Sequence, residues 1–166
     1  MVSDVLILSC DRVSASMDLY AELTQLLAAF EERHIDYALC GGVALAVHGV
    51  PRATQDIDIL ALEESLPAVR LCAQASGFVF EAEPMDFSSG VTIVRFTKLI
   101  SEQPLMLDVL IAKGPLQRVW AGRLTMPFES GQVKVVSREG LITLKLAAGR
   151  PQDIADIQRL KEIHRG

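Results

Sequence analysis

Two aspartates one residue apart lie inside an apolar run of this chain. Asp56 and Asp58 belong to residues 56–61, which read DIDILA. If this run is a β-strand, both carboxylates point to one face of a sheet, and Ile57 and Ile59 point to the other. Two like charges side by side repel each other, and folding alone does not require them. A bound divalent metal ion is the simplest reason to keep both, so we interpret the rest of the chain as a scaffold for this pair.

A glycine pair precedes these aspartates. Residues 37–40 (YALC) predict a short buried strand, Gly41 and Gly42 a turn, and residues 43–48 a short helix. Backbone N–H groups at such a turn can bind an anion such as a phosphate, whereas a lone glycine pair is more often an ordinary tight turn. Only one short helix and a loop separate the turn from Asp56. We therefore expect both features at one edge of the sheet.

A third acid lies in a later apolar run. Asp108 is embedded in LMLDVLI, which predicts a core strand. A buried carboxylate is costly unless it has a partner or a metal ion. Together with Asp56 and Asp58 it would form a site of hard oxygen ligands suited to Mg²⁺. The alternative is that Asp108 pairs with an arginine such as Arg95 and that Asp56 caps a turn.

The order of the predicted elements favours an α/β or α+β fold with a mixed β-sheet flanked by helices. We expect one domain over residues 17–166 and an N-terminal arm over residues 1–16. Residues 83–90 contain Pro, Asp, Ser and Gly and predict a loop. Helices are predicted over 17–34, 63–76, 138–148 and 152–164, and strands over 56–61, 78–81, 91–98, 105–111, 124–128 and 133–136.

The composition excludes several classes of protein. Half of the 166 residues are apolar, which is typical of a globular chain, and the net charge of −5 argues against broad, non-specific nucleic-acid binding. The three cysteines have no zinc-ligand spacing and are expected to be reduced thiols. No window approaches the roughly 20 apolar residues of a transmembrane helix. We therefore expect a cytoplasmic protein without membrane contact.

The C-terminal part places one cation in an apolar helix. Lys145 lies in the helix predicted over residues 138–148, which is apolar on nearly every side and should be buried. A phosphate or one of the three acids would then be its partner, unless the lysine reaches out to solvent. Arg150, Asp153 and Asp156 are spaced to support Lys145 or the edge of the site. The alternative for these three is an ordinary salt-bridged helix start.

The loop before the aspartate pair contributes two further polar residues. Arg52 and Thr54 flank the approach to Asp56. They are candidates either to touch phosphates or to fix the loop.

Together the glycine turn, Asp-x-Asp and the third aspartate resemble the signature of nucleotidyltransferases of the DNA polymerase β superfamily. The run GGVALAVHGVPRATQDIDI is most similar to the small bacterial branch with minimal (MNT-type) and AbiEii-type enzymes of toxin–antitoxin and phage-defence systems. It is also similar to aminoglycoside and lincosamide nucleotidyltransferases. The tail SREGLITLKLAAGRPQDIADIQRL resembles the later AbiEii-type motif, so the resemblance covers roughly residues 35–160.

The resemblance implies a site, a cofactor and a co-substrate. Asp56, Asp58 and Asp108 would be the catalytic residues and the ligands of two Mg²⁺ ions, with Asp108 assisting deprotonation of the acceptor. The co-substrate would be an NTP such as ATP. The nucleotide-binding residues would be Gly41, Gly42, Arg52, Thr54 and Lys145, with Arg150, Asp153 and Asp156 as support.

The implied reaction moves an NMP from an NTP to a hydroxyl group. The acceptor would be a protein, a tRNA or a small molecule, within a toxin–antitoxin or defence system whose partner is a cognate toxin or antitoxin. One alternative is a catalytically silent nucleotidyltransferase-fold antitoxin or interaction module, although the intact acid triad disfavours it. Another alternative is an antibiotic nucleotidyltransferase. We expect a monomer or a homodimer.

Overall fold

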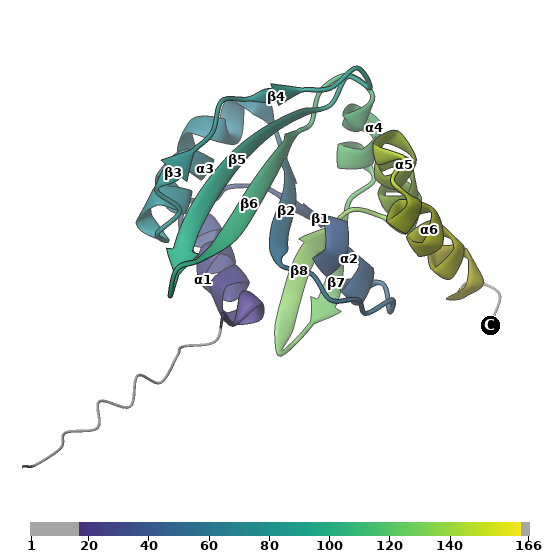
Figure 1. Ribbon diagram of the computed structural model, residues 1–166, viewed down its shortest axis with the longest axis horizontal. Coiled ribbons are helices and arrows are strands. Elements are labelled where there is room, and N and C mark those ends of the chain that lie inside the picture. Colours follow the sequence, from purple (N-terminus) through teal and green to yellow (C-terminus); the bar gives the residue numbers. More distant parts are fainter. Residues whose placement is uncertain (1–16, 164–166) are drawn as a thin grey trace, which may run out of the picture.

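A mixed β-sheet is the centre of the computed structural model, which describes residues 17–163 (Figure 1). The predicted arm over residues 1–16 lies outside the described residues. The strands are β1 (Ala38–Cys40), β2 (Asp56–Ala61), β3 (Phe80–Glu81), β4 (Met85–Asp86), β5 (Thr92–Ile100), β6 (Gln103–Ile111), β7 (Leu124–Phe128) and β8 (Gly131–Val135).

The strand order brings distant parts of the chain together. It runs β3-β5-β6-β2-β1-β8-β7, with β4 also paired to β5. The pairs β2–β6 and β1–β8 are parallel, and the remaining pairs are antiparallel. The two strands predicted to carry the acids, β2 and β6, are therefore direct neighbours in the middle of the sheet. This arrangement confirms the predicted mixed α/β architecture.

Helices cover the sheet unequally. Seen as in Figure 1, α1 and α3 lie behind the sheet, whereas α5 and α6 lie side by side at the end where β1 meets α2. The front of β5 and β6 is left without a covering helix in this view. The helices are α1 (Leu19–Glu32), α2 (Gly41–Val47), α3 (Leu66–Ala75), α4 (Leu116–Ala121), α5 (Arg138–Ala148) and α6 (Pro151–Ile163), with a short 3₁₀ turn over Glu63–Ser65.

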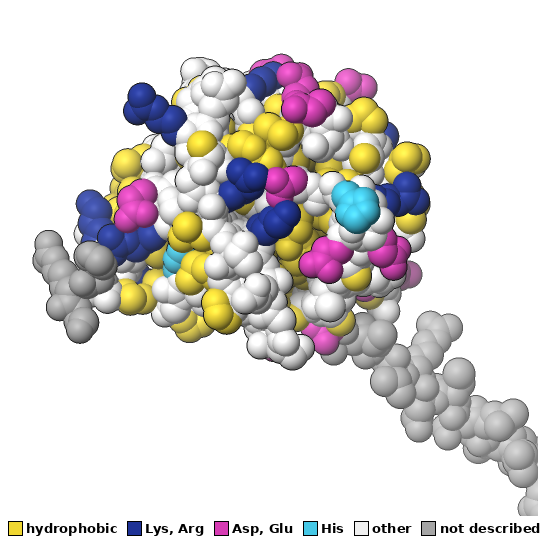
Figure 2. Space-filling model, turned by 180° about the vertical axis from the view of Figure 1, so that it is seen from behind, with side chains coloured by type: hydrophobic (Ala, Val, Ile, Leu, Met, Phe, Trp, Pro, Cys, Tyr) yellow, Lys and Arg dark blue, Asp and Glu magenta, His cyan; other side chains and the backbone are white. Residues whose placement is uncertain are grey.

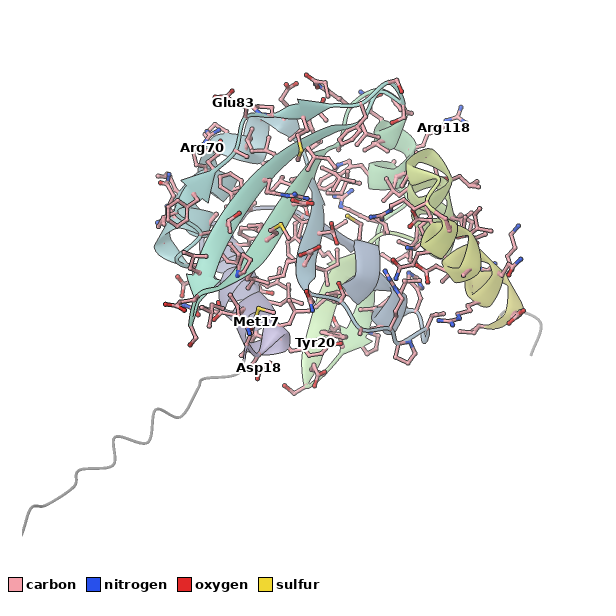
Figure 3. The ribbon with its side chains drawn as sticks, in the orientation of Figure 1. Met17, Asp18, Tyr20, Arg70, Glu83 and Arg118 are labelled. Carbon is pink, nitrogen blue, oxygen red and sulfur yellow. The ribbon has the colours of Figure 1, made fainter. Side chains whose placement is uncertain are left out.

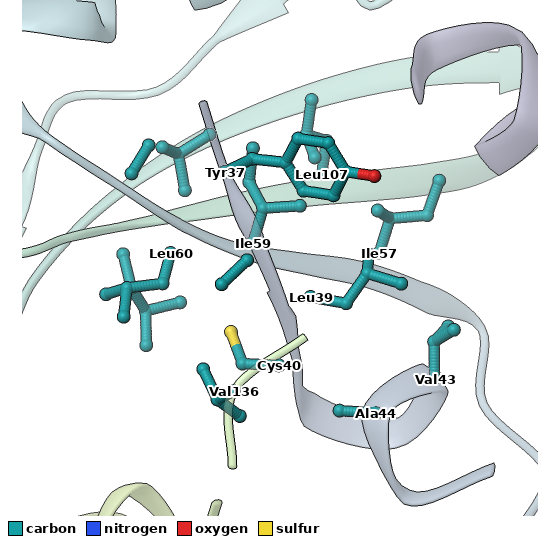
Figure 4. Packing of buried hydrophobic residues seen from close by; sticks show 14 of the residues in the cluster. Tyr37, Leu39, Cys40, Val43, Ala44, Ile57, Ile59, Leu60, Leu107 and Val136 are labelled. Carbon is teal, nitrogen blue, oxygen red and sulfur yellow. The ribbon is translucent and has the colours of Figure 1, made fainter. Parts of the chain in front are cut away.

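Alternation along the central strands separates the core from the open face. Ile57 and Ile59 of β2 and Leu107 and Val109 of β6 are fully buried. They pack in one hydrophobic cluster with residues of β1 and α2, part of which is drawn in Figure 4. The intervening residues of β2 and β6 point to the opposite face. Burial of the isoleucines therefore orients the acids away from the core.

Two expectations from the sequence were wrong in detail. The segment predicted as a loop over residues 83–90 contains β4, because Met85 and Asp86 add to the edge of β5 and Thr92 Oγ1 donates to Asp86 Oδ1 at 2.5 Å. The helix α5 is not buried on nearly every side, since Leu146 is 66% exposed. Only part of α5 packs against α6, α4 and α2, so its remaining apolar residues face a pocket or solvent.

The reverse face carries charges of both signs. Figure 2 shows basic and acidic side chains interspersed there among hydrophobic ones, without one dominant basic field. Within residues 17–163, no helix combines the length and apolar character needed to cross a membrane.

Candidate active site

The three predicted acids lie on one face of adjacent strands. In the parallel β2–β6 pair, Asp58 stands directly opposite Asp108, and Asp56 stands opposite Met106. Asp56 and Asp58 are two residues apart on β2, so their side chains share the face that Asp108 also occupies. The structure therefore brings together the three carboxylates that the sequence pattern grouped.

The glycine turn touches this acid cluster. Gly41 has φ +64, and a Cβ atom added there would overlap the carboxylate of Asp58. A Cβ atom added at Gly42 would lie 2.6 Å from Cβ of Thr54. Both positions therefore need glycine, because the backbone at the start of α2 approaches two side chains of the acid-bearing segment.

The acids destabilise one another's charged forms. Burial, reinforced by the charges of Asp108 and Asp56, raises the pKa of Asp58 to about 7. Burial and the charge of Asp108 also raise the pKa of Asp56. Nearby Arg150 and Lys145 oppose the shift of the Asp58 pKa without cancelling it. The cluster thus has a deficit of positive charge, which a bound cation would supply.

Asp108 already has a cationic partner. Arg95, its register partner on β5, donates from Nε to Oδ1 and from Nη2 to Oδ2, both at 2.7 Å. This pairing is the arginine alternative considered from the sequence. By contrast, Oδ1 of Asp56 is buried and has no hydrogen-bond partner in the described part of the chain.

The side chains, as they stand, do not form a finished metal site. Among the described residues, no three His, Cys, Asp or Glu side chains are gathered closely enough to hold a metal ion. Both oxygens of Asp108 accept hydrogen bonds from Arg95, whereas Oδ1 of Asp56 accepts none from residues 17–163. The donor chemistry therefore suits Mg²⁺, provided that the side chains rearrange.

Lys145 has anionic partners other than those expected. Its Nζ donates to Asp156 Oδ2 at 2.9 Å and to Asp153 Oδ1 at 3.4 Å, and all three residues are buried. Arg150 donates from Nε to Asp153 Oδ2 at 2.8 Å. The expected pairing of Lys145 with a triad acid is therefore replaced by pairing with α6. Asp153 thus pairs with both Lys145 and Arg150, and Asp156 pairs with Lys145.

Arg52 contacts α6, and Thr54 contacts its own segment. Arg52 Nε lies 3.6 Å from Asp156 Oδ2, an ion pair that is too long for a hydrogen bond. Thr54 Oγ1 donates to the backbone carbonyl of Asp56 at 3.3 Å. These contacts are compatible with loop fixation, and the role of either residue in binding phosphate stays a prediction.

A pocket of about 340 Å³ lies over Asp58 and Asp108, whereas Asp56 is not among its lining residues. Its size is within the range of small-molecule sites. Its polar wall includes Asp58, Asp108, Arg95, Lys145 and Arg150. Its apolar wall comes from the β4–β5 loop, β5, β6 and α5, and comprises Phe87, Val91, Ile93, Leu110, Leu141, Leu144, Ala147 and Ala148.

A second hollow is more open and less suited to the chemistry. Met17, Asp18 and Tyr20, labelled at the start of α1 in Figure 3, line it together with Arg52 and Thr54. It includes none of the three clustered acids, so we place the candidate site in the pocket over Asp58 and Asp108.

Several pocket residues were missed from the sequence. Phe87 and Ser89 belong to a segment predicted only as a loop, and Cys40 was assigned only to a buried strand. Arg95 was considered as a partner of Asp108 but not as part of the site. The available signal was a single charge within the otherwise uncharged run VTIVRFT. In the structure, its neighbours Val94 and Phe96 face the core.

Comparisons with known proteins agree with this geometry. The family described as "Nucleotidyl transferase AbiEii toxin, Type IV TA system" matches residues 25–166. No curated protein sequence matches the chain.

Two solved structures have a similar fold. ANT(2")-Ia in complex with adenylyl-2"-tobramycin has a TM-score of 0.61 and 20% identity, covering 88% of each chain. The lincosamide antibiotic adenylyltransferase LnuA, bound to lincomycin, has a TM-score of 0.59 and 17% identity, covering 86% of this chain and 96% of its own. At these identities the likeness shows a shared fold.

Proposed function

The chain belongs to the AbiEii nucleotidyltransferase family, and from this premise we propose that it transfers an NMP from an NTP to a hydroxyl acceptor in a Mg²⁺-dependent reaction. The observation that carries the proposal is the direct pairing of Asp58 with Asp108 beside Gly41. Carboxylates on adjacent strands, next to a turn that only glycine fits, would provide metal ligands and a binding place for a triphosphate.

The proposed metal ligands are Asp56, Asp58 and Asp108. Oδ1 of Asp56 is buried and has no hydrogen-bond partner within the described residues, and the pKa of Asp58 is raised. Both observations support a cation at this position. We propose two Mg²⁺ ions, as in related phosphoryl chemistry, which would neutralise charge on the attacking and leaving oxygens.

The remaining residues would position the reactants. The backbone at Gly41 and Gly42 would receive the triphosphate, and Lys145 and Arg150 would add positive charge along the pocket. The acceptor oxygen forms a bond to the α-phosphorus. The bond between the α-phosphorus and the oxygen that bridges it to the β-phosphate breaks, and pyrophosphate leaves. Asp108 would take the proton of the acceptor hydroxyl, which requires its carboxylate to part from Arg95.

The acceptor is a protein hydroxyl, a tRNA end or a small molecule. The family description supports a toxin–antitoxin setting and therefore an antitoxin partner. The net charge of −5 and the mixed charges in Figure 2 disfavour a broad RNA-binding face. The antibiotic-modifying neighbours favour testing aminoglycosides and lincosamides as acceptors.

Transfer of label from each α-³²P NTP with Mg²⁺ tests the proposal. The acceptors are cell protein, total tRNA, an aminoglycoside and a lincosamide, each offered to wild type, Asp58→Asn and the control Glu64→Gln. Glu64 is exposed on the 3₁₀ turn before α3. We expect transfer by wild type and Glu64→Gln and at least a 100-fold loss in Asp58→Asn. Equal transfer by Asp58→Asn would refute the proposal.

The silent-module alternative predicts a different result. A non-catalytic antitoxin or interaction module should bind no Mg²⁺-NTP in a calorimetric titration. Metal-dependent nucleotide binding that is lost in Asp58→Asn would support the enzyme.

A further inference from the structure

We propose that Arg95 is a positioning residue that holds Asp108 while the site lacks metal and nucleotide, and that pairs with the triphosphate once they bind. The inference rests on the proposed function and extends it to a residue outside the predicted signature. In this exchange the guanidinium leaves one anion, the carboxylate, for another, the phosphate.

The contact between Arg95 and Asp108 competes with metal binding. Each oxygen of Asp108 accepts a 2.7 Å hydrogen bond from the same guanidinium. A carboxylate oxygen has a second lone pair, but a Mg²⁺ ion on it would lie beside a fixed positive charge. The ion would therefore bind Asp108 well only after Arg95 withdraws from at least one oxygen.

The pairing is useful before the substrate arrives. Asp108 is 6% exposed and lies opposite Asp58, so without a partner it would be a buried charge beside another acid. Arg95 compensates that charge, and its positive charge also opposes the rise of the Asp56 pKa. Arg95 thus takes the place that a cation would fill in the loaded site.

Arg95 is also positioned so that it can release Asp108. Its side chain is 36% exposed and borders the pocket, whereas the side chain of Lys145 is 5% exposed and tied to two aspartates. The planar guanidinium fork matches phosphate oxygens as well as it matches a carboxylate. A triphosphate in the pocket would therefore meet Arg95 without a change in the backbone.

Metal titration without nucleotide tests the first half of the proposal. We expect Arg95→Met to bind Mg²⁺ or Mn²⁺ at least fivefold more tightly than wild type, measured by calorimetry and by the metal-dependent rise in Tm. Arg70→Met is the matched control, because Arg70 makes a bidentate pair with Glu81 away from the pocket. Arg95→Lys keeps the charge but loses the planar guanidinium. It controls for a folding defect in Arg95→Met, and its metal affinity should lie between those of wild type and Arg95→Met.

Nucleotide kinetics test the second half. In Arg95→Met the KM for the NTP should rise at least tenfold while kcat changes less, so that metal affinity and nucleotide affinity move in opposite directions. Unchanged or weaker metal binding in both Arg95 variants would overturn the proposal, and so would an unchanged KM. If wild type transfers no nucleotide but the metal affinity still rises in Arg95→Met, the proposed function fails while the competition at Asp108 stands.

Discussion

Asp58 and Asp108 are register partners on β2 and β6, yet only Asp108 has a cationic partner among the described side chains. The site is therefore electrostatically asymmetric. Arg95 neutralises Asp108, whereas the pKa of Asp58 is raised because Asp58 is buried beside two like charges. This asymmetry determines how the protein should respond to pH and to metal ions.

The metal-free protein should lose stability as the pH rises through neutrality. The pKa of Asp58 is about 7 in the folded protein, above its ordinary value of 3.8. An acid with a raised folded pKa favours the folded state most below pH 3.8, and that advantage is lost as the pH rises toward 7. Asp58→Asn removes this penalty, so it should be more stable than wild type at pH 8 by at least about 1 kcal/mol, since one unit of pKa shift corresponds to about 1.4 kcal/mol.

Thermal unfolding in EDTA between pH 5 and pH 8 measures the effect. The difference in Tm between Asp58→Asn and wild type should grow with pH, whereas Glu64→Gln should follow wild type throughout. A constant difference across this range would contradict the assigned shift in the Asp58 pKa.

Mg²⁺ should reverse the order of stability. A ligand that binds only the folded state stabilises it by RT ln(1 + [L]/Kd), about 2.7 kcal/mol at 100 times Kd. Saturating Mg²⁺ should therefore raise the Tm of wild type at pH 8 but leave that of Asp58→Asn nearly unchanged. An equal rise in the Tm of wild type and Asp58→Asn with Mg²⁺ would mean that the metal binds elsewhere. The same titration with Ca²⁺ indicates whether the site prefers the smaller ion.

The acids could be grouped from the sequence because strand periodicity is a local property. Asp56 and Asp58 alternate with Ile57 and Ile59, and this pattern alone orients them. Their neighbour Asp108 was predicted from the cost of burying a charge, not from a known register. These physical rules apply without knowledge of the tertiary structure.

The partners of the cations could not be predicted in the same way. Burial of Lys145 followed from its apolar neighbours, but its pairing with Asp156 depends on how α6 packs against α5. Likewise, the pairing of Arg95 with Asp108 depends on the register of β5 on β6. The exposure of Leu146 was missed because an apolar run by itself does not show which of its residues another element will cover.

Removing Lys145 should strongly destabilise the fold. Lys145→Met leaves Asp153 and Asp156 buried without its positive charge, and breaking such a buried pair costs about 3–5 kcal/mol. Lys134→Met is the matched control, because Lys134 pairs with Asp36 at the surface and should cost about 1 kcal/mol or less. Urea unfolding measures both, and adding Asp156→Asn to Lys145→Met should recover part of the loss. Equal stability of the two lysine variants would contradict the buried network.

Gly41 should tolerate alanine much less well than a glycine of similar backbone conformation. Alanine at a positive φ costs roughly 1 kcal/mol by itself. At Gly41 the added methyl group would also overlap the carboxylate of Asp58, whereas Gly114, with φ +54, has no atom within 4 Å of an added Cβ. We expect Gly41→Ala to lose at least 1 kcal/mol more than Gly114→Ala in chemical unfolding and to abolish transfer. Similar losses of stability in the two variants would show that the side chain of Asp58 can move away from the added methyl group.

A bulky side chain on α5 should block the pocket over Asp58 and Asp108 without destabilising the fold. Ala147 is exposed and lines the pocket, whereas the adjacent Leu146 is 66% exposed and lies outside the pocket lining. Ala147→Trp would place a large ring in a space of about 340 Å³, so we expect nucleotide transfer to fall at least tenfold with little change in Tm. Leu146→Trp adds similar bulk one residue away and should retain activity. Neither variant should lower the Tm much, because surface substitutions usually change stability by about 0.5 kcal/mol or less. Equal activity of the two variants would therefore mean that the substrates bind outside this pocket.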